Sequence, residues 1–133
     1  MSNRLLHRIT CGIYEAIGSI QLHFKDGHES QTFGSTTGQQ LRCSLEVPED
    51  ETITGIRMRH SSKRPSIQNI TFDTDQGTEI EFNGKMSDGD WTEFQLDQGE
   101  LVVGCYGSCW SENQPEIVAL GFVVWTPSNT NDN

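Results

Sequence analysis

The stretch IGSIQLHF, at residues 17–24, returns twice along the chain at a spacing of 50 residues. The later copies are IQNITFDT at residues 67–74 and IVALGFVV at residues 117–124. Their apolar positions coincide, as at Ile20, Ile70 and Leu120. A repeated period indicates one small structural unit that buries its apolar face against its own copies. The sequence therefore predicts a closed β structure with approximate three-fold symmetry.

A second repeat, with an offset of 49 residues, supports this prediction. The segment at residues 45–56 matches the segment at residues 94–105 at five positions. Leu45, Val47, Glu51, Ile53 and Ile56 correspond to Phe94, Leu96, Glu100, Val102 and Cys105. The repeated unit therefore includes a strand, a turn and a second strand.

Alternating apolar and polar residues predict short strands, and Asp-Gly, Asn-Gly and Pro-containing segments predict the turns between them. We expect strands at residues 5–10, 14–25, 41–47, 52–59, 67–74, 78–82, 91–96, 100–106 and 116–125, and a loop or weak strand at residues 30–40. No segment keeps a helical period. The expected fold is an all-β prism of three Greek-key-like sheets with about 10–12 strands. The alternative is an ordinary sandwich in which the 50-residue spacing is chance.

The size and charge of the chain limit its function. We expect residues 1–126 to form one domain and residues 127–133 a flexible polar tail. The net charge of −10 argues against nucleic acid or an anionic membrane surface as a partner. No apolar segment approaches the roughly 20 residues of a membrane-spanning helix. A basic cluster is the exception to the acidic composition, and we expect it to be a solvated strand end and loop; it comprises Arg57, Arg59, Lys63 and Arg64.

The first residues, MSNRLLHRITCG, contain no apolar run long enough for a signal peptide. A cytoplasmic location is therefore expected, with secretion by an unusual route or after removal of a leader as the alternative. The cysteines are then expected to be free thiols. Cys105 replaces an apolar residue of the repeat, which favours a buried thiol over a disulfide or a zinc site with Cys109.

Four stretches carry a resemblance to a known family. They are AIGSIQLHFKDG at residues 16–27, ETITGI at 51–56, IQNITFDTDQG at 67–77 and ELVVGCYG at 100–107. With the strands placed as above, the chain resembles the jacalin-related lectins over roughly residues 5–125. The resemblance implies three four-stranded Greek keys and non-catalytic binding of an oligosaccharide or glycoprotein glycan, without a metal or other cofactor.

The chain departs from the family at two places. The family usually opens with a Gly-rich strand pair that forms one wall of the sugar site, whereas Leu5 already corresponds to the second or third strand. The family also has a Gly-x-x-x-Asp loop before its last strand. Here the loop at residues 107–116 is longer, and Val118 stands where the Asp is expected. Glu112, Asn113 or Glu116 is a candidate to replace that carboxylate.

The loop at residues 107–116 has the chemistry that a neutral sugar requires. Carboxylate and amide oxygens accept hydroxyl protons, backbone N–H groups donate, and an aromatic ring stacks on the C–H face of the sugar. The expected carbohydrate-binding residues are Gly107, Ser108, Trp110, Glu112 and Asn113, with Lys63 from the loop at residues 60–66. The alternative for Trp110 is that it folds back to cover the end of the prism.

The remaining motifs give weaker indications. The segment at residues 73–79 begins like a calcium loop, but Gly84 stands where the bidentate Glu is required. Trp91 is expected at the start of a strand, and His23 on an outward, solvated face. No nucleophile, metal-protease or phosphate-binding motif is present, so we expect no enzyme activity. The alternative function is a protein-interaction prism that has lost sugar binding. Another chain would then cover its open sheet edge. A homo-oligomer is also expected to be possible.

Overall fold

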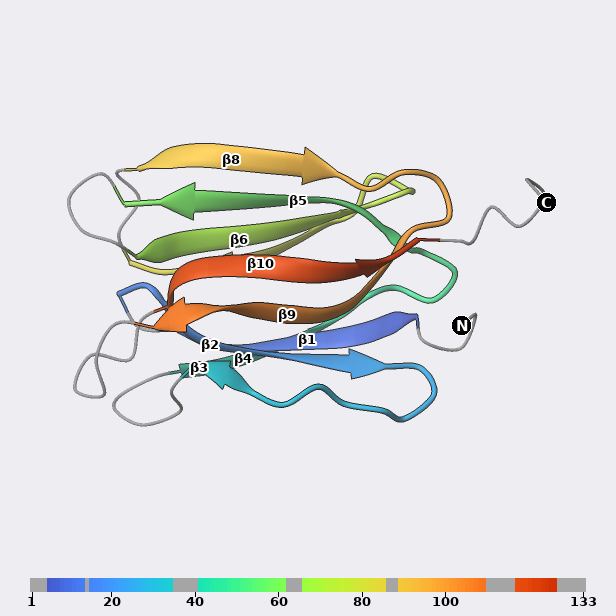
Figure 1. Ribbon diagram of the computed structural model, residues 1–133, viewed down its shortest axis with the longest axis horizontal. Helices are drawn as coiled ribbons and strands as arrows, with labels where there is room; N and C mark the ends of the chain where they lie inside the picture. Colours follow the sequence, from blue (N-terminus) through green and yellow to red (C-terminus); the bar gives the residue numbers. More distant parts are fainter. Residues whose placement is uncertain are drawn as a thin grey trace.

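The structure, a computed structural model, describes residues 5–13, 15–34, 41–61, 66–85, 89–109 and 117–126. These residues form ten strands and no helix (Figure 1). The strands are β1 (Leu6–Ile13), β2 (Ile17–Phe24), β3 (Phe33–Gly34), β4 (Leu41–Glu46), β5 (Ile53–His60), β6 (Ile67–Thr74), β7 (Glu79–Asn83), β8 (Asp90–Gln95), β9 (Leu101–Cys109) and β10 (Ile117–Trp125). The described part of the chain contains no helix that could cross a membrane.

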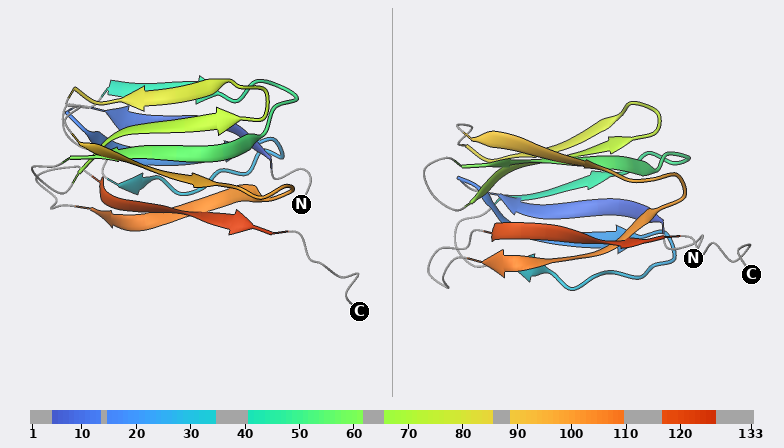
Figure 2. Two further views of the ribbon diagram at one scale, coloured as in Figure 1. Left: turned by 90° about the horizontal axis from the view of Figure 1, so that it is seen from above. Right: turned by 45° about the horizontal axis from the view of Figure 1, so that its top comes forward.

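The strands form three antiparallel sheets around one core (Figures 1 and 2). The first has the order β3-β2-β1-β4, and the second has the order β7-β6-β5-β8. In each, the fourth strand returns to lie beside the first, which is Greek-key connectivity. The third sheet contains only β10 and β9 in the described residues. The all-β prism of three sheets is the architecture that the repeats predict.

The repeat spacing corresponds to three equivalent hairpins, β1–β2, β5–β6 and β9–β10. Each hairpin shows a register shift close to its connecting end, at Gly12/Ile13, Arg59/His60 and Ile117/Ala119. At the other end of each hairpin, the residue at position 24, 74 or 124 pairs with Leu6, Ile53 or Val102. The 50-residue spacing of the sequence repeat therefore reflects a structural repeat, and the sandwich alternative is wrong.

The core lies where the inward faces of the three hairpins meet. Ile20 and Ile70 are completely buried, and Leu120 is 8% exposed. Because side chains alternate along a strand, Gln21, Thr71 and Gly121 lie on the outward side. Burying one such aliphatic side chain stabilises the fold by about 1.5–3 kcal/mol, so the repeated apolar positions supply the main stabilising contacts.

Several boundaries differ from those expected. β1 continues beyond Thr10 to Ile13, because Cys11 points into the core and Ile13 pairs with Ile17. β2 begins at Ile17 and not at residue 14. The weak strand expected within residues 30–40 is the two-residue β3, and the predicted tail at residues 127–133 lies outside the described residues.

The third sheet differs from the four-stranded sheet that the family resemblance implies. In the described residues it has two strands, β9 and β10, with no counterparts of β3 and β4 or of β7 and β8. Within the described ranges, the third sheet therefore has two strands fewer than either of the other sheets.

The three described cysteine side chains are free thiols, as expected. Cys11 is buried, and burial is the main cause that raises the pKa of its thiol. Cys105 is half-buried beside Phe122 on the inward side of β9, and desolvation raises its pKa to about 11. Cys105 therefore occupies its repeat position as a packing residue with a free thiol.

Candidate functional site

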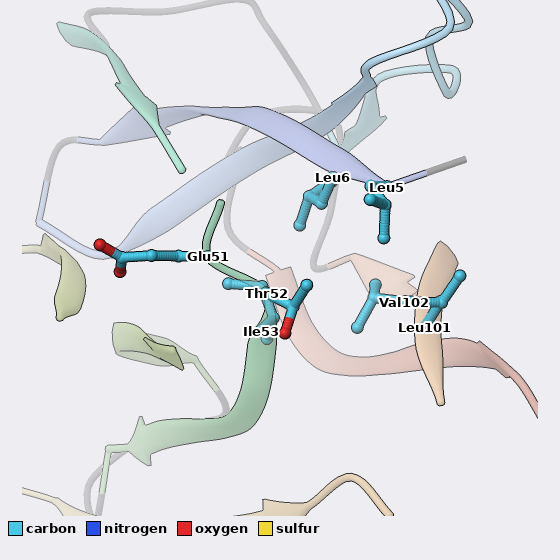
Figure 3. A pocket seen from close by; sticks show the side chains of 7 residues that line it. All are labelled: Leu5, Leu6, Glu51, Thr52, Ile53, Leu101 and Val102. Carbon is cyan, nitrogen blue, oxygen red and sulfur yellow. The ribbon is translucent and has the colours of Figure 1, made fainter. Parts of the chain in front are cut away.

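The two ends of the prism are built differently. At one end, the equivalent side chains Leu6, Ile53 and Val102 converge on the axis (Figure 3). They line a cavity of about 10 Å³, which has room for about one water molecule. Apolar packing closes the axis of the prism at this end. A more open hollow of about 550 Å³ lies at the same end, beside the axis, and is lined by His7, Lys25, Glu46, Val47, Pro48, Glu49 and Asp50.

The opposite end carries the connections within all three hairpins, namely β1–β2, β5–β6 and β9–β10. The end of β3, the start of β4, the end of β7 and the start of β8 also lie at this end (Figure 1). Loops held by a rigid sheet frame are the usual place for binding residues. The loop-bearing end of the prism is therefore the candidate functional site, and it is called the loop end below.

Close backbone packing fixes the described part of the loop end. The Gly84 N–H donates to the Gln68 carbonyl at 2.8 Å, and the Lys85 N–H donates to the Glu15 carbonyl at 3.0 Å. A side chain at Gly89 would overlap the backbone of His60. The Gly89 contact lies within the second sheet, whereas the Lys85–Glu15 hydrogen bond joins the second sheet to the first, and a β-carbon at Gly84 would overlap the Glu15 carbonyl oxygen.

The structure brings two of the predicted sugar-binding residues to the loop end. Gly107 and Ser108 are exposed near the end of β9, opposite Leu120 and Ala119. Gly107 packs against the backbone of Ala119, where a β-carbon would overlap the carbonyl oxygen. The exposed backbone of this segment therefore depends on a glycine at position 107.

The other predicted residues are outside the described part of the chain. Trp110, Glu112 and Asn113 belong to the β9–β10 connection, and Lys63 belongs to the β5–β6 connection. The strand ends on either side of both connections lie at the loop end. Val118, at the position of the family's Asp, is half-buried at the register shift of β10 and supplies no carboxylate.

An exposed tryptophan on the outer face of the second sheet was not predicted. Trp91 of β8 is 45% exposed and lies opposite Arg59 of β5. The guanidinium carbons of Arg57 and Arg59 lie 6.0 and 5.7 Å from the ring centroid. Phe94 packs against the core, and Trp91 lies three residues before it on the same strand. Because side chains alternate between the two faces of a strand, this odd spacing is the sequence signal that Trp91 points outward.

Both described members of the basic cluster donate hydrogen bonds, Arg57 to acidic side chains and Arg59 to the Gly89 carbonyl at 2.9 Å. Arg57 donates two hydrogen bonds to Asp73, at 2.8 and 3.0 Å, and one to Glu79 at 3.0 Å. The hydrogen bonds to Asp73 are the main cause that raises the pKa of Arg57. Asp73 is therefore the ion-pair partner of Arg57. The described residues contain no group of three or more side chains that could hold a metal ion.

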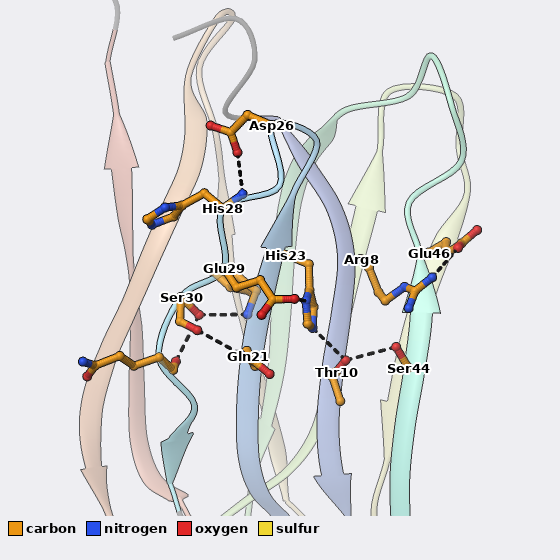
Figure 4. A network of polar contacts seen from close by, with 12 residues as sticks. Arg8, Thr10, Gln21, His23, Asp26, His28, Glu29, Ser30, Ser44 and Glu46 are labelled. Atoms are coloured by element: carbon orange, nitrogen blue, oxygen red, sulfur yellow. Dashed lines mark hydrogen bonds and ion pairs between the residues drawn. The ribbon is translucent and has the colours of Figure 1, made fainter.

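His23 is hydrogen bonded on both ring nitrogens, which differs from the solvated residue expected (Figure 4). Its Nε2 lies 3.0 Å from Thr10 Oγ1, and its Nδ1 lies 2.8 Å from Glu29 Oε2. Thr10 Oγ1 also lies 3.0 Å from Ser44 Oγ. This network links three strands across the outer face of the first sheet.

The order of hydroxyl, imidazole and carboxylate in this network is that of a hydrolytic triad. A triad also needs free backbone N–H groups for an oxyanion. Thr10 lies on a central strand, in register with Gln21 on one side and Ser44 on the other. The backbone groups around Thr10 are therefore engaged in pairing with the two neighbouring strands. The network therefore links β1, β2 and β4 of the first sheet through side chains.

The comparisons with known proteins agree with the prism of three β-sheets. The family model described as "Jacalin-like lectin domain" matches residues 4–123. No curated protein matches the chain. A prostate-specific WGA16 glycoprotein lectin has a similar structure, with a TM-score of 0.75 and 23% identity, over 95% of this chain and 86% of that lectin.

Two further similar structures are sugar complexes. Artocarpin with mannotriose has a TM-score of 0.72 and 19% identity, over 92% of this chain and 84% of artocarpin. Jacalin with melibiose has a TM-score of 0.68 and 15% identity, over 90% of this chain and 91% of jacalin. These structures share the prism fold, and the family model covers nearly all of the described strands. The chain belongs to the jacalin-like lectin domain family.

Proposed function

We propose that this protein binds glycans without catalysis, through the loop end of the prism. The observation that carries the proposal is that a member of the lectin domain family exposes Gly107 and Ser108 where β9 enters the β9–β10 connection. The ligand is an oligosaccharide, free or on a glycoprotein. Artocarpin with mannotriose and jacalin with melibiose, which share the fold, are consistent with this ligand class.

Each proposed residue has a separate role. Trp110 stacks on the C–H face of a sugar ring, and Glu112 and Asn113 accept or donate hydrogen bonds to hydroxyl groups. The backbone at Gly107 and Ser108 contributes N–H and C=O groups. Lys63, from the β5–β6 connection, contributes a charged donor. Because Val118 has no carboxylate, Glu112, Asn113 or Glu116 takes over the task of the family's Asp.

A glycan-array screen of the wild-type protein tests the function, and Trp110→Ala and Glu112→Ala test the site. Trp91→Ala and Glu93→Ala are matched controls, since they remove the same side-chain types from the outer face of the second sheet. We expect both loop variants to lose binding and both controls to retain it. Binding to no glycan contradicts the function, and binding unaffected by both loop variants contradicts the site.

A protein-interaction module is the second candidate function. It is favoured by the two-stranded third sheet, which leaves a strand edge without a partner in the described residues. A protein that binds no glycan on the array but associates stably through this edge would be of this second kind.

A further inference from the structure

Tyr106 of β9 presents an exposed aromatic ring on the outer face of the third sheet. Its side chain is 60% exposed, and it pairs opposite Gly121 of β10. A β-carbon at position 121 would lie 2.5 Å from Tyr106 Cζ and 2.7 Å from its hydroxyl oxygen. The ring therefore leans across to β10, with its hydroxyl end resting on the backbone of Gly121. One side of the ring is supported by the sheet, and the other side is open to solvent.

This arrangement is specific to the third sheet. The hairpin registers make Thr10 and Arg57 the equivalents of Tyr106 in the other two sheets, and polar residues pair opposite them where Gly121 pairs opposite Tyr106. Thr10 belongs to the hydrogen-bonded network of the first sheet, and Arg57 forms ion pairs with two carboxylates. An aromatic side chain that covers a glycine also stabilises a sheet. That role accounts for the supported side of the Tyr106 ring and leaves its open side without a contact.

The exposed ring is continuous with the proposed glycan site. Tyr106, Gly107 and Ser108 are three consecutive exposed residues, where β9 reaches the loop end (Figure 1). Because side chains alternate along a strand, Tyr106 and Ser108 lie on the same face, about 7 Å apart. The residues that pair opposite them on β10 are Gly121 and Ala119, which have no side chain or a small one. This part of the outer face is therefore flat.

The surface around the ring is uncharged. Neither β9 nor β10 contains Asp, Glu, Lys or Arg, although the chain has a net charge of −10. The next pair along the same face is Gly104 with Val123, and Val123 is 45% exposed. An ionic ligand would find no opposite charge on these strands. A neutral pyranose ring fits the surface, because its C–H face can stack on an open aromatic ring without bringing a charge.

We propose that Tyr106 forms a second sugar subsite, called the Tyr106 subsite below, on the outer face of the third sheet. It binds the next residue of a neutral oligosaccharide whose terminal residue is held at the loop end. The C–H face of this second pyranose ring stacks on the open side of the Tyr106 ring, and Ser108 Oγ hydrogen bonds to a hydroxyl group nearer the loop end. The subsite rests on the proposed function and names its ligand class, a neutral oligosaccharide of at least two residues.

Isothermal titration calorimetry with a neutral oligosaccharide identified on the array, and with its terminal monosaccharide, tests the Tyr106 subsite. We expect the wild type to bind the oligosaccharide about tenfold more tightly than the monosaccharide, which corresponds to about 1.4 kcal/mol. Tyr106→Ala should remove this difference and leave the affinity for the monosaccharide unchanged. Tyr106→Phe should keep the difference, because stacking requires the ring and not its hydroxyl group.

Gly121→Ala tests the position of the ring without removing it. The new β-carbon would displace the hydroxyl end of Tyr106, so the oligosaccharide should lose most of its advantage over the monosaccharide. Gly104→Ala is the matched control on the same face. A β-carbon at position 104 would make an ordinary contact with Val123 at 3.6 Å, so this variant should keep the wild-type difference.

The outcomes separate failure of the subsite from failure of the proposed function. Equal affinities of the wild type for the two ligands, or an unchanged difference in Tyr106→Ala, would overturn the subsite alone. Equal effects of Gly121→Ala and Gly104→Ala would also overturn it, and this comparison does not depend on the folding of Tyr106→Ala. A wild type that binds neither ligand would overturn the proposed function and the subsite together.

Discussion

Phe72 and Phe122 meet edge to face in the core, with ring centroids 5.7 Å apart and ring planes at 82°. They occupy equivalent positions in the second and third repeats, and Leu22 is the corresponding residue of the first. Edge-to-face pairs of this kind add about 0.5–1.5 kcal/mol to the stabilisation from burial. The repeats thus contact one another through the same positions that make them similar in sequence.

The three-fold core predicts similar losses of stability at equivalent positions. Ile20→Ala, Ile70→Ala and Leu120→Ala should each reduce the free energy of unfolding by about 2–5 kcal/mol. Leu120→Ala should be lowest in this range, because Leu120 alone retains some exposure. Chemical denaturation measures these values. Glu81→Ala, at an exposed position of β7, is the control and should change stability by less than about 0.5 kcal/mol. A nearly unchanged Ile70→Ala protein would contradict the prism.

Glycine at position 89 should be required for the geometry of the loop end. Gly89→Ala brings a β-carbon onto the backbone of His60, so the main chain must move. Gly77→Ala is the matched control, because Gly77 has a φ of +86° but open space around it. The control should cost about 1–2 kcal/mol through backbone strain alone. We expect Gly89→Ala to be less stable than Gly77→Ala and to bind glycan more weakly. Equal stability and unchanged affinity would show that the close approach is unimportant.

The buried thiols should make stability fall at alkaline pH. Burial raises the pKa of Cys105 from 9.0 to about 11, so its thiol ionises in the unfolded chain before it ionises in the folded protein. The contribution is fully present below about pH 9 and is lost as the pH rises towards 11. Cys105→Val preserves the apolar packing, and its stability should fall less steeply over this range. An identical pH profile for the variant and the wild type would refute this prediction.

The Arg57–Asp73 ion pair should contribute modestly and depend on salt. Its side chains are 30% and 25% exposed, which weakens the interaction through solvent screening. Asp73→Asn should lower the free energy of unfolding by at most about 1 kcal/mol. The loss should shrink at high ionic strength. Glu46→Gln, which breaks the more exposed pair with Arg8, should have a smaller effect. A larger loss for Glu46→Gln would reverse the expected order.

The fold could be predicted largely from the sequence, because the apolar positions repeat at a constant spacing. Ile20, Ile70 and Leu120 face the core as predicted, since alternation fixes the side of a strand on which each residue lies. The strand ends were less predictable. The continuation of β1 to Ile13 depends on pairing with Ile17, and this tertiary contact leaves no local pattern.

The candidate site could be predicted only in part. The sequence indicates the β9–β10 connection through its polar residues and Trp110, and the structure brings Gly107 and Ser108 to the loop end. The exposed Trp91 and the hydrogen-bonded His23 were not anticipated, because their environments come from residues on other strands. Arg59 faces Trp91 across a strand pair, and Glu29 reaches His23 from the segment after β2.

A titration followed by ¹H–¹⁵N correlation spectra, with a glycan identified on the array, tests the proposed site most directly. Binding at the loop end should shift the backbone amide signals of Gly107 and Ser108. The signals of Leu6, Ile53 and Val102, at the closed end of the prism, should stay in place. Shifts confined to the closed end, with Gly107 and Ser108 unchanged, would contradict the account.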